Sequence, residues 1–224
     1  MPIPSLIKQV AEIKIASFCK NKIPAHALIK GDPRYSYGLP LTGKGEITNA
    51  NYLWMQIFAM ALNDKGRAGF VMANSATDAG NAEKEIRKKM IEAGIFDIII
   101  SVGTNMFMNE RFPVRSYFLI RVGQTGKIRY FLLMLQDIFT VIDRAHNEWS
   151  DEQIQEIATI ARRYRKEEGE GIYEDIKGRC KVATLEEVQV NDYSLNPGRY
   201  VEIIEKEISI RKSIILHLDF IWLY

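Results

Sequence analysis

The chain has 224 residues and a net charge of +2, because 30 basic residues oppose 28 acidic ones. This length predicts one domain, or one domain with an appendage. With 47% hydrophobic and 26% charged residues, the composition is that of an ordinary globular protein with enough apolar residues for a core. Since the charges nearly balance, net charge neither requires nor excludes a nucleic-acid partner.

The cysteines and histidines predict neither a disulfide framework nor a metal site. Cys19 and Cys180 form no Cys-x-x-Cys pair, and we expect free thiols in a reducing compartment. The histidines are scattered singly, without metal-ligand spacing. The most apolar segment, Ser213–Tyr224, is too short to span a bilayer. These features predict a cytoplasmic protein with no membrane segment and no bound metal.

The first third of the chain predicts a loop and a helix. In residues 1–30 only Leu6–Phe18 has helical spacing, and the segment stays unassigned. Residues 31–48 are rich in glycine, proline and turn formers, and loops of this length are usually functional or disordered. Apolar positions then predict a helix over Ala50–Leu62, with Asn49 as its N-cap.

Three segments next predict a strand–helix–strand unit. Ala68–Ala73 and Ile95–Val102 are short apolar runs typical of buried strands. Between them, Ala82–Ala93 has acidic residues near its start and lysines further along, as helices do, and Gly94 is the expected C-terminal glycine. The unit predicts two parallel strands joined by a right-handed crossover.

The carboxyl ends of these two strands are the predicted ligand side of the sheet. In open α/β sheets, ligands bind beyond the carboxyl ends of the parallel strands. Here those ends lead into Asn74–Gly80 and Gly103–Asn109. We therefore expect site residues in these two connections.

The rest of the chain predicts two more strands and two capped helices. Val114–Val122 is typical of a strand, and a turn leads from it to a strand over Lys127–Leu135, expected to be antiparallel to the first. Ser150–Gln153 and Thr184–Glu187 are capping boxes. We expect a helix from the first to about Arg165, and a short helix after the second.

Several short segments follow one family pattern in order and spacing. They are Gly31–Pro40, Asn49–Gln56, Gly66–Asn74, Glu85–Lys88, Phe107–Val114, Asp143–His146, Tyr173–Asp175, Cys180–Thr184 and Asn196–Tyr200. Together they resemble the modification (methylase) subunits of type I restriction–modification systems, over roughly Lys30 to Val201. The resemblance does not extend to residues 1–29, 129–139 or 202–224.

The resemblance implies a site-specific DNA adenine-N6 methyltransferase. In that family S-adenosylmethionine is the methyl donor, DNA is the substrate, and a specificity subunit and a restriction subunit are the partners. Because the amine of a paired base is out of reach, the base must be flipped into a pocket. The family's Asn/Asp-Pro-Pro-aromatic loop accepts the amine hydrogens and stacks on the base, while a glycine-rich strand-to-helix turn holds the cofactor.

Neither motif is present in this sequence, in which no two of the seven prolines are adjacent and no Gly-x-Gly turn follows an apolar strand. The resemblance therefore implies an α/β fold that is the C-terminal half of a Rossmann-like methyltransferase sheet with a helical C-terminal appendage, inactive alone. The expected divisions are an unassigned segment 1–30, a partial methyltransferase domain 31–147, a helical C-terminal region 148–201 and an unassigned tail 202–224.

Two other interpretations remain open. One is a non-catalytic subunit-docking module or degenerate remnant, with the helix after Ser150 and the Tyr173–Tyr200 segment as its contact region. The other is an unrelated nucleotide-binding α/β enzyme, which would need a glycine-rich phosphate turn.

The resemblance also indicates which side chains would meet DNA. Phe107, just past a strand end, is the candidate to pack against a flipped adenine, with simple loop packing as the alternative. Asn109 and Asn74 are polar base-contact candidates, with turn formation as the alternative. Arg34 and Lys44 are candidates for DNA phosphate contacts, which position a protein without reading sequence. A solvated helix end is expected for Arg162, Arg163, Arg165 and Lys166.

Overall fold

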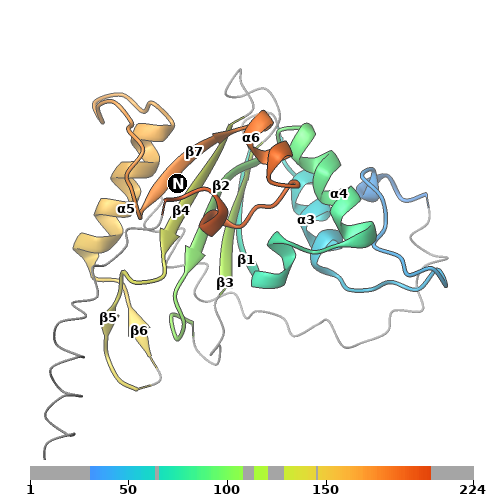
Figure 1. Cartoon of the computed structure of the whole chain (residues 1–224), viewed down its shortest axis with the longest axis horizontal. Coiled ribbons are helices and arrows are strands. Elements are labelled where there is room, and N and C mark those ends of the chain that lie inside the picture. The colour runs from blue at the N-terminus through green and yellow to red at the C-terminus, as the bar shows by residue number, and fades with distance from the viewer. Residues whose placement is uncertain (1–30, 64–65, 108–113, 121–128, 145, 203–224) are drawn as a thin grey trace, which may run out of the picture.

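A computed structural model describes residues 31–63, 66–107, 114–120, 129–144 and 146–202. These residues form an α/β fold in which one five-stranded sheet lies between helices (Figure 1). The possible helix over Leu6–Phe18 and the site candidate Asn109 lie outside the described residues. No helix in the described part of the chain is long and apolar enough to cross a membrane.

The sheet has the strand order β1-β3-β2-β4-β7. Its strands are β1 (Arg67–Ala73), β2 (Phe96–Val102), β3 (Val114–Ile120), β4 (Arg129–Leu135) and β7 (Cys180–Thr184). β1, β2 and β4 run in one direction, because β2 pairs parallel with β4 while β1 and β2 both pair antiparallel with β3. β7 pairs antiparallel with β4, so the stretch 148–201, expected to be helical, also supplies an edge strand.

Two predictions about strand direction are confirmed, and the structure adds which strands lie side by side. β1 and β2 are parallel, as the strand–helix–strand unit predicts, but β3 lies between them. β4 is antiparallel to β3, yet it pairs with the far side of β2. All seven residues of β2 are buried, because strands cover both its edges and helices cover both its faces. An apolar run predicts such burial but not which strands provide it.

Four helices and several short elements complete the described fold. They are α3 (Asn51–Met60), α4 (Asn81–Glu92), α5 (Asp151–Tyr164), α6 (Leu185–Val190), the 3-10 turns η2 (Pro33–Tyr35), η3 (Asn74–Thr77) and η4 (Pro197–Arg199), and the hairpin strands β5 (Thr140–Val141) and β6 (Asn147–Glu148). Both predicted capping boxes form, at Ser150 and Thr184. The N-cap of α3 is Ala50 rather than Asn49, although the Asn49 side chain accepts the Asn51 amide hydrogen.

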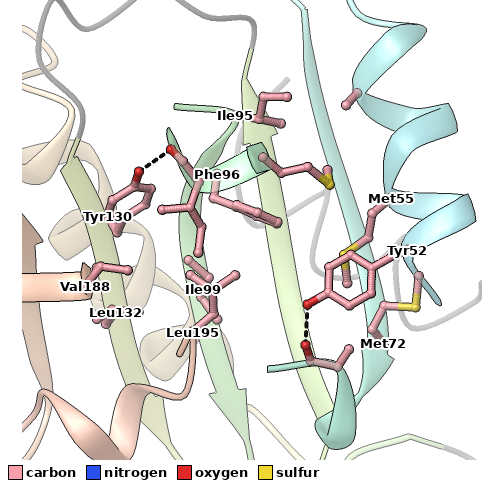
Figure 2. Close-up of a cluster of buried hydrophobic side chains, with 14 of the residues drawn as sticks. Tyr52, Met55, Met72, Ile95, Phe96, Ile99, Tyr130, Leu132, Val188 and Leu195 are labelled. Carbon is pink, nitrogen blue, oxygen red and sulfur yellow. Dashed lines mark hydrogen bonds between the residues drawn. The ribbon is translucent and has the colours of Figure 1, made fainter. Parts of the chain in front are cut away.

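The sheet has a hydrophobic core on each face, because successive residues of a strand point to opposite sides. On one face, Ile99, Tyr130 and Leu132 pack with buried residues of α3, α4 and α6 (Figure 2). On the other face, Ile100 and Phe131 pack with buried residues of α5. Packing on both faces therefore stabilises the sheet from which the connections at the two ends of the strands extend.

Candidate functional site

Because β1, β2 and β4 run in one direction, their carboxyl ends lie at the same end of the sheet. The connections that follow these strands form the candidate site. β3 starts at this end, because Val114 pairs with both Ala73 and Val102. Neighbouring strands lie about 4.8 Å apart, so the connections after β1 and β2 begin roughly 10 Å from each other. The sheet thus places Asn74 and the turn that leads to Phe107 at the same end.

A close backbone approach joins the connection after β2 to the connection after β4. A Cβ atom at Gly103 would lie 2.8 Å from the carbonyl oxygen of Gln136. Backbone cannot yield to such a contact as a flexible side chain can, so only glycine fits where these connections meet. Gly103 therefore fixes the point at which the chain leaves β2.

Asn147, on β6, holds the same turn from another side. Its backbone N–H donates to the carbonyl oxygen of Asn105 at 2.8 Å, and its side-chain amide donates to the carbonyl oxygen of Thr104 at 3.0 Å. Asn105 has a φ of 59°, a left-handed conformation that asparagine adopts more readily than most residues. The turn of residues 103–107 and the β5–β6 hairpin therefore form one unit.

Asn147 is a residue of the candidate site that the sequence did not point to. The residue is only 6% exposed, and buried polar groups normally have hydrogen-bond partners that fix their surroundings. The sequence around it is polar and gives no sign of this burial. The partners of Asn147 lie more than 40 residues earlier in the chain, so only the fold reveals them.

Phe107 and Asn74 remain candidates after the structure is known. Phe107 is half-buried and, like Met106, packs against the core beneath α5, so the fold covers the residue only in part. Asn74 is exposed at the start of η3, where its carbonyl oxygen accepts a 2.7 Å hydrogen bond from the Thr77 hydroxyl. Their contacts with a base stay predictions.

The connection after β1 is anchored by two distant parts of the chain. The hydroxyl of Tyr52, on α3, donates a 2.5 Å hydrogen bond to the carbonyl oxygen of Ala76 (Figure 2). Burial raises the pKa of Tyr52 to about 12, which keeps the hydroxyl protonated as a donor. From the C-terminal side, Ser194 and Asn196 donate to the carboxylate of Asp78 at 2.5 and 3.2 Å. Segments far apart in sequence thus hold one connection.

Arg34 and Lys44 lie away from this turn, in the loop that packs on α3. That loop is at the opposite end of the molecule from the β5–β6 hairpin (Figure 1). The Arg34 guanidinium lies 2.6 Å from the Asp32 carboxylate and lowers the pKa of that carboxyl group. Lys44 is exposed at the tip of a small hairpin. The structure does not bring these two cations to the 103–107 turn.

The end of α5 corrects an expectation. Nη2 of Arg165 lies 2.5 Å from Oδ2 of Asp97, and the two side chains are 8% and 1% exposed. Arg162 pairs with Glu170 at 3.2 Å, and Nε of Arg163 donates to the carbonyl oxygen of the same glutamate. The prediction of a solvated helix end is therefore wrong for Arg165, whose partner is a charged residue within the apolar β2 run.

The described residues give little support to metal or thiol chemistry. No group of three or more His, Cys, Asp or Glu side chains among them could hold a metal ion. Cys180 is a buried free thiol, and burial raises its pKa, which disfavours the nucleophilic thiolate. The candidate site is made of polar and aromatic side chains, such as Asn74 and Phe107, on connections at the carboxyl ends of parallel strands.

Comparison with known sequences gives one family and several relatives. Residues 18–208 match the family model described as N-6 DNA Methylase. The chain is 33% identical over 177 residues to the type I restriction enzyme HindI methylase subunit of Haemophilus influenzae, and 34% identical over 192 residues to the MjaIX methylase subunit of Methanocaldococcus jannaschii. These alignments cover 79% and 83% of this chain but 38% and 33% of the relatives, so the chain spans about a third of their length.

Solved structures show the same fold. The type I restriction–modification methyltransferase subunit of Streptococcus thermophilus superposes with a TM-score of 0.69 at 25% identity, covering 82% of this chain and 36% of that chain. The EcoKI M protein superposes with a TM-score of 0.55 at 12% identity, covering 78% and 43%. The family match also includes residues 18–29 and 129–139, where the sequence alone shows no resemblance.

Proposed function

The chain belongs to the N-6 DNA methylase family, and from this premise we propose that it is part of a type I modification subunit, a site-specific adenine-N6 DNA methyltransferase. DNA is then the substrate, S-adenosylmethionine the methyl donor, and a specificity subunit and a restriction subunit the partners. The observation that carries the proposal is the tethered 103–107 turn at the carboxyl end of β2, in a fold shared with the Streptococcus thermophilus subunit.

In this proposal the tethered turn presents Phe107 to a flipped adenine. A base that leaves the DNA stack loses stacking energy, and contact with an aromatic ring restores part of it. Because Gly103 and Asn147 already fix the turn, little conformational entropy is lost when the base arrives. Asn74, at the same end of the sheet, and Asn109, two residues beyond the ring, are the proposed polar contacts.

DNA backbone contacts complete the proposed substrate site. Arg34 and Lys44 are the proposed phosphate contacts, and both side chains are exposed. The pairing of Arg34 with Asp32 leaves this arginine less positive toward DNA than Lys44, so Lys44 is the stronger of the two proposals. Such contacts would raise affinity without affecting which sequence is methylated.

We propose that the methyl donor binds to a part of the family's domain outside these 224 residues. The connection from β1 to α4 contains one glycine, Gly80, and is filled by η3, so it does not fit a glycine-rich cofactor turn. Among the described strands, β1 pairs on one side only. A half-domain that continues beyond β1 accounts for both features, with residues 31–147 as its methyltransferase part and 148–201 as the region that closes the far edge.

A region exchange tests the proposed function. Residues 31–202 of this chain would replace the aligned region of the Haemophilus influenzae HindI methylase subunit, and methyl transfer to adenine in that subunit's DNA would be measured with its partner subunits. We expect the chimera to transfer methyl groups, and Phe107→Ala to lower the rate at least ~10-fold, since one good stacking contact contributes about 1–3 kcal/mol.

The matched control is Phe58→Ala, which removes a half-buried ring on α3, in the other core. It should leave the methylation rate of the folded chimera within about two-fold, because a ring that packs only in the fold changes stability and not transition-state binding. A chimera that is stabilised by S-adenosylmethionine and yet transfers no methyl groups would contradict the proposal. A clear thermal shift of the 224-residue chain alone with S-adenosylmethionine would contradict the half-domain part of it.

A further inference from the structure

A cavity of about 520 Å³ lies at the opposite ends of the strands from the candidate site. It is lined by residues from the end of α5, by the segment that follows α5, by Val182 of β7, and by Arg129, the first residue of β4. A strand of seven residues is roughly 20 Å long, so the length of the sheet separates this cavity from the 103–107 turn. It is a second concave feature, separate from the proposed methylation site.

Two tyrosine rings form part of the cavity wall and are fixed by their own contacts. Tyr164 stacks on Phe131 with ring centroids 4.9 Å apart, and Tyr173 meets Phe131 edge-on at 5.5 Å. The Tyr164 hydroxyl donates to the Arg129 carbonyl oxygen at 3.2 Å, and the Tyr173 hydroxyl donates to the Asp175 carboxylate at 2.8 Å. Because the rings are held before a ligand arrives, binding against them costs little side-chain entropy.

Positive charge exceeds negative charge around the cavity. Its lining includes three cationic side chains, those of Arg129, Arg163 and Lys166, and one carboxylate, that of Glu167. The other two arginines at this helix end, Arg162 and Arg165, are already paired with carboxylates and do not line it. Cationic groups beside aromatic rings are the chemistry that binds a phosphate attached to a planar base.

Lys166 occupies a backbone position at which glycine is the preferred residue. It follows the C-cap of α5 and has a φ of 57°, in the left-handed region. Its N–H donates to the Arg163 carbonyl oxygen, and the Glu167 N–H donates to the Arg162 carbonyl oxygen, both at 3.0 Å, which is the Schellman pattern. Residues held in such conformations cluster at functional sites. The chain thus keeps an ammonium group at the cavity at a conformational cost.

We propose that this cavity binds a nucleoside phosphate, with Arg129, Arg163 and Lys166 holding the phosphate and Tyr164 and Tyr173 contacting the base. Its volume falls within the range of about 300–1,000 Å³ typical of small-molecule sites. A free mononucleotide and a nucleotide within a single DNA strand present this same chemistry. The proposal does not depend on methyl transfer by the site at the other end of the strands.

The test is calorimetric binding of adenosine 5′-monophosphate to the full chain and to Lys166→Gly. Glycine adopts the left-handed conformation without a Cβ penalty, so this variant should unfold at an equal or higher temperature than the wild type. We expect it to bind the nucleotide at least ~10-fold more weakly, because a charge-assisted phosphate contact is lost. The matched control Lys89→Gln removes one exposed positive charge on α4, which covers the other face of the sheet, and should bind like the wild type.

Each alternative outcome has a definite meaning. No binding by the wild type at millimolar nucleotide, or equal weakening in both variants, would overturn the site. Inorganic phosphate that binds as tightly as the nucleotide would overturn the role of the tyrosine wall. If a thymidine oligonucleotide of about eight residues binds more tightly than the mononucleotide and loses that advantage in Lys166→Gly, the ligand is a DNA strand. If the mononucleotide binds more tightly, the ligand is free nucleotide.

Discussion

Helices α4 and α5 cover opposite faces of one sheet and end in the same hydrogen-bond pattern, but their left-handed residues differ. After α4, Gly94 has a φ of 66° and donates to the Ile91 carbonyl oxygen at 2.7 Å, as the sequence predicts for a C-terminal glycine. After α5, the equivalent residue is Lys166. One helix end uses the residue with the lowest conformational cost, whereas the other keeps a cation beside a cavity. The helix end formed by Gly94 shows which residue suits this backbone conformation, so the different residue at Lys166 points to a role beyond folding, such as binding a ligand.

The two helices also differ in the partners of the buried arginine that links each helix to the rest of the fold. On α4, Arg87 is 2% exposed and donates to the carbonyl oxygens of Ala79 and Tyr193 at 2.6 and 2.8 Å. At the end of α5, Arg165 meets the carboxylate of Asp97 instead. A carbonyl oxygen is neutral, so the first arrangement leaves no charge behind when the arginine is removed. The second leaves an unpaired ion when either partner is removed.

The largest expected effect is that of Asp97→Ala. The substitution leaves the Arg165 guanidinium buried without its carboxylate, and breaking such a pair costs about 3–5 kcal/mol of the free energy of unfolding. Arg87→Met should cost less, about 1–3 kcal/mol, because the two hydrogen bonds that it removes go to neutral carbonyl oxygens. Urea denaturation of both variants measures the difference.

The control is the double variant Asp97→Ala with Arg165→Met, which removes both charges and should recover more than half of the stability lost in Asp97→Ala. If the double variant is as unstable as the single one, the loss comes from packing and the contrast between the two helices disappears.

Helix ends and strand positions, which depend on neighbouring residues, could be predicted from the sequence. The order of the strands, which depends on contacts between distant residues, could not. Both capping boxes, the glycine after α4 and the apolar runs of β1 and β2 are local, and each was found where expected. The place of β3 between β1 and β2 depends on pairing across the sheet, which no short segment encodes. Local sequence patterns therefore indicate where helices and strands form, whereas long-range pairing determines which strands lie next to each other in the sheet.

The same division applies to the candidate site and the buried ion pair. The parallel strands predicted which end of the sheet would carry the candidate site, and the 103–107 turn lies at that end. Its anchor, Asn147, could not be predicted, because its partners come from a distant connection. Asp97 and Arg165 are 68 residues apart, so a charge within an apolar strand was the only sequence signal of their pairing.

A smaller effect is expected on the α4 side of the sheet, for Tyr52→Phe. The variant leaves the Ala76 carbonyl oxygen without this donor, which should cost about 1–2 kcal/mol at pH 7. The pKa of Tyr52 is about 12 in the folded protein and about 10 in an unfolded chain, so folding favours the protonated form. This stabilisation is fully present below pH 10 and is lost as the pH rises through about 12.

Urea denaturation of both proteins between about pH 8 and 11 gives the free energy of unfolding at each pH. This free energy should fall more steeply for the wild type than for Tyr52→Phe, by up to about 1.4 kcal/mol per pH unit above pH 10. Burial also raises the pKa of Tyr130, but that residue is present in both proteins, so the difference between them reports Tyr52. Parallel pH profiles would show that the Tyr52 hydroxyl is not held protonated by the fold.

The smallest effects come from exchanging the residues at the two helix ends, and they bear most directly on the comparison. Gly94→Lys places a Cβ atom in a left-handed conformation and should destabilise the protein by roughly 1 kcal/mol. Lys166→Gly removes the same penalty and should stabilise it by up to about 1 kcal/mol. Thermal unfolding of each variant and of the double variant gives both values. Because the positions lie on opposite faces of the sheet, the effects should add. If Lys166→Gly destabilises the protein instead, the lysine serves the fold, and the contrast between the two helix ends no longer points to a ligand.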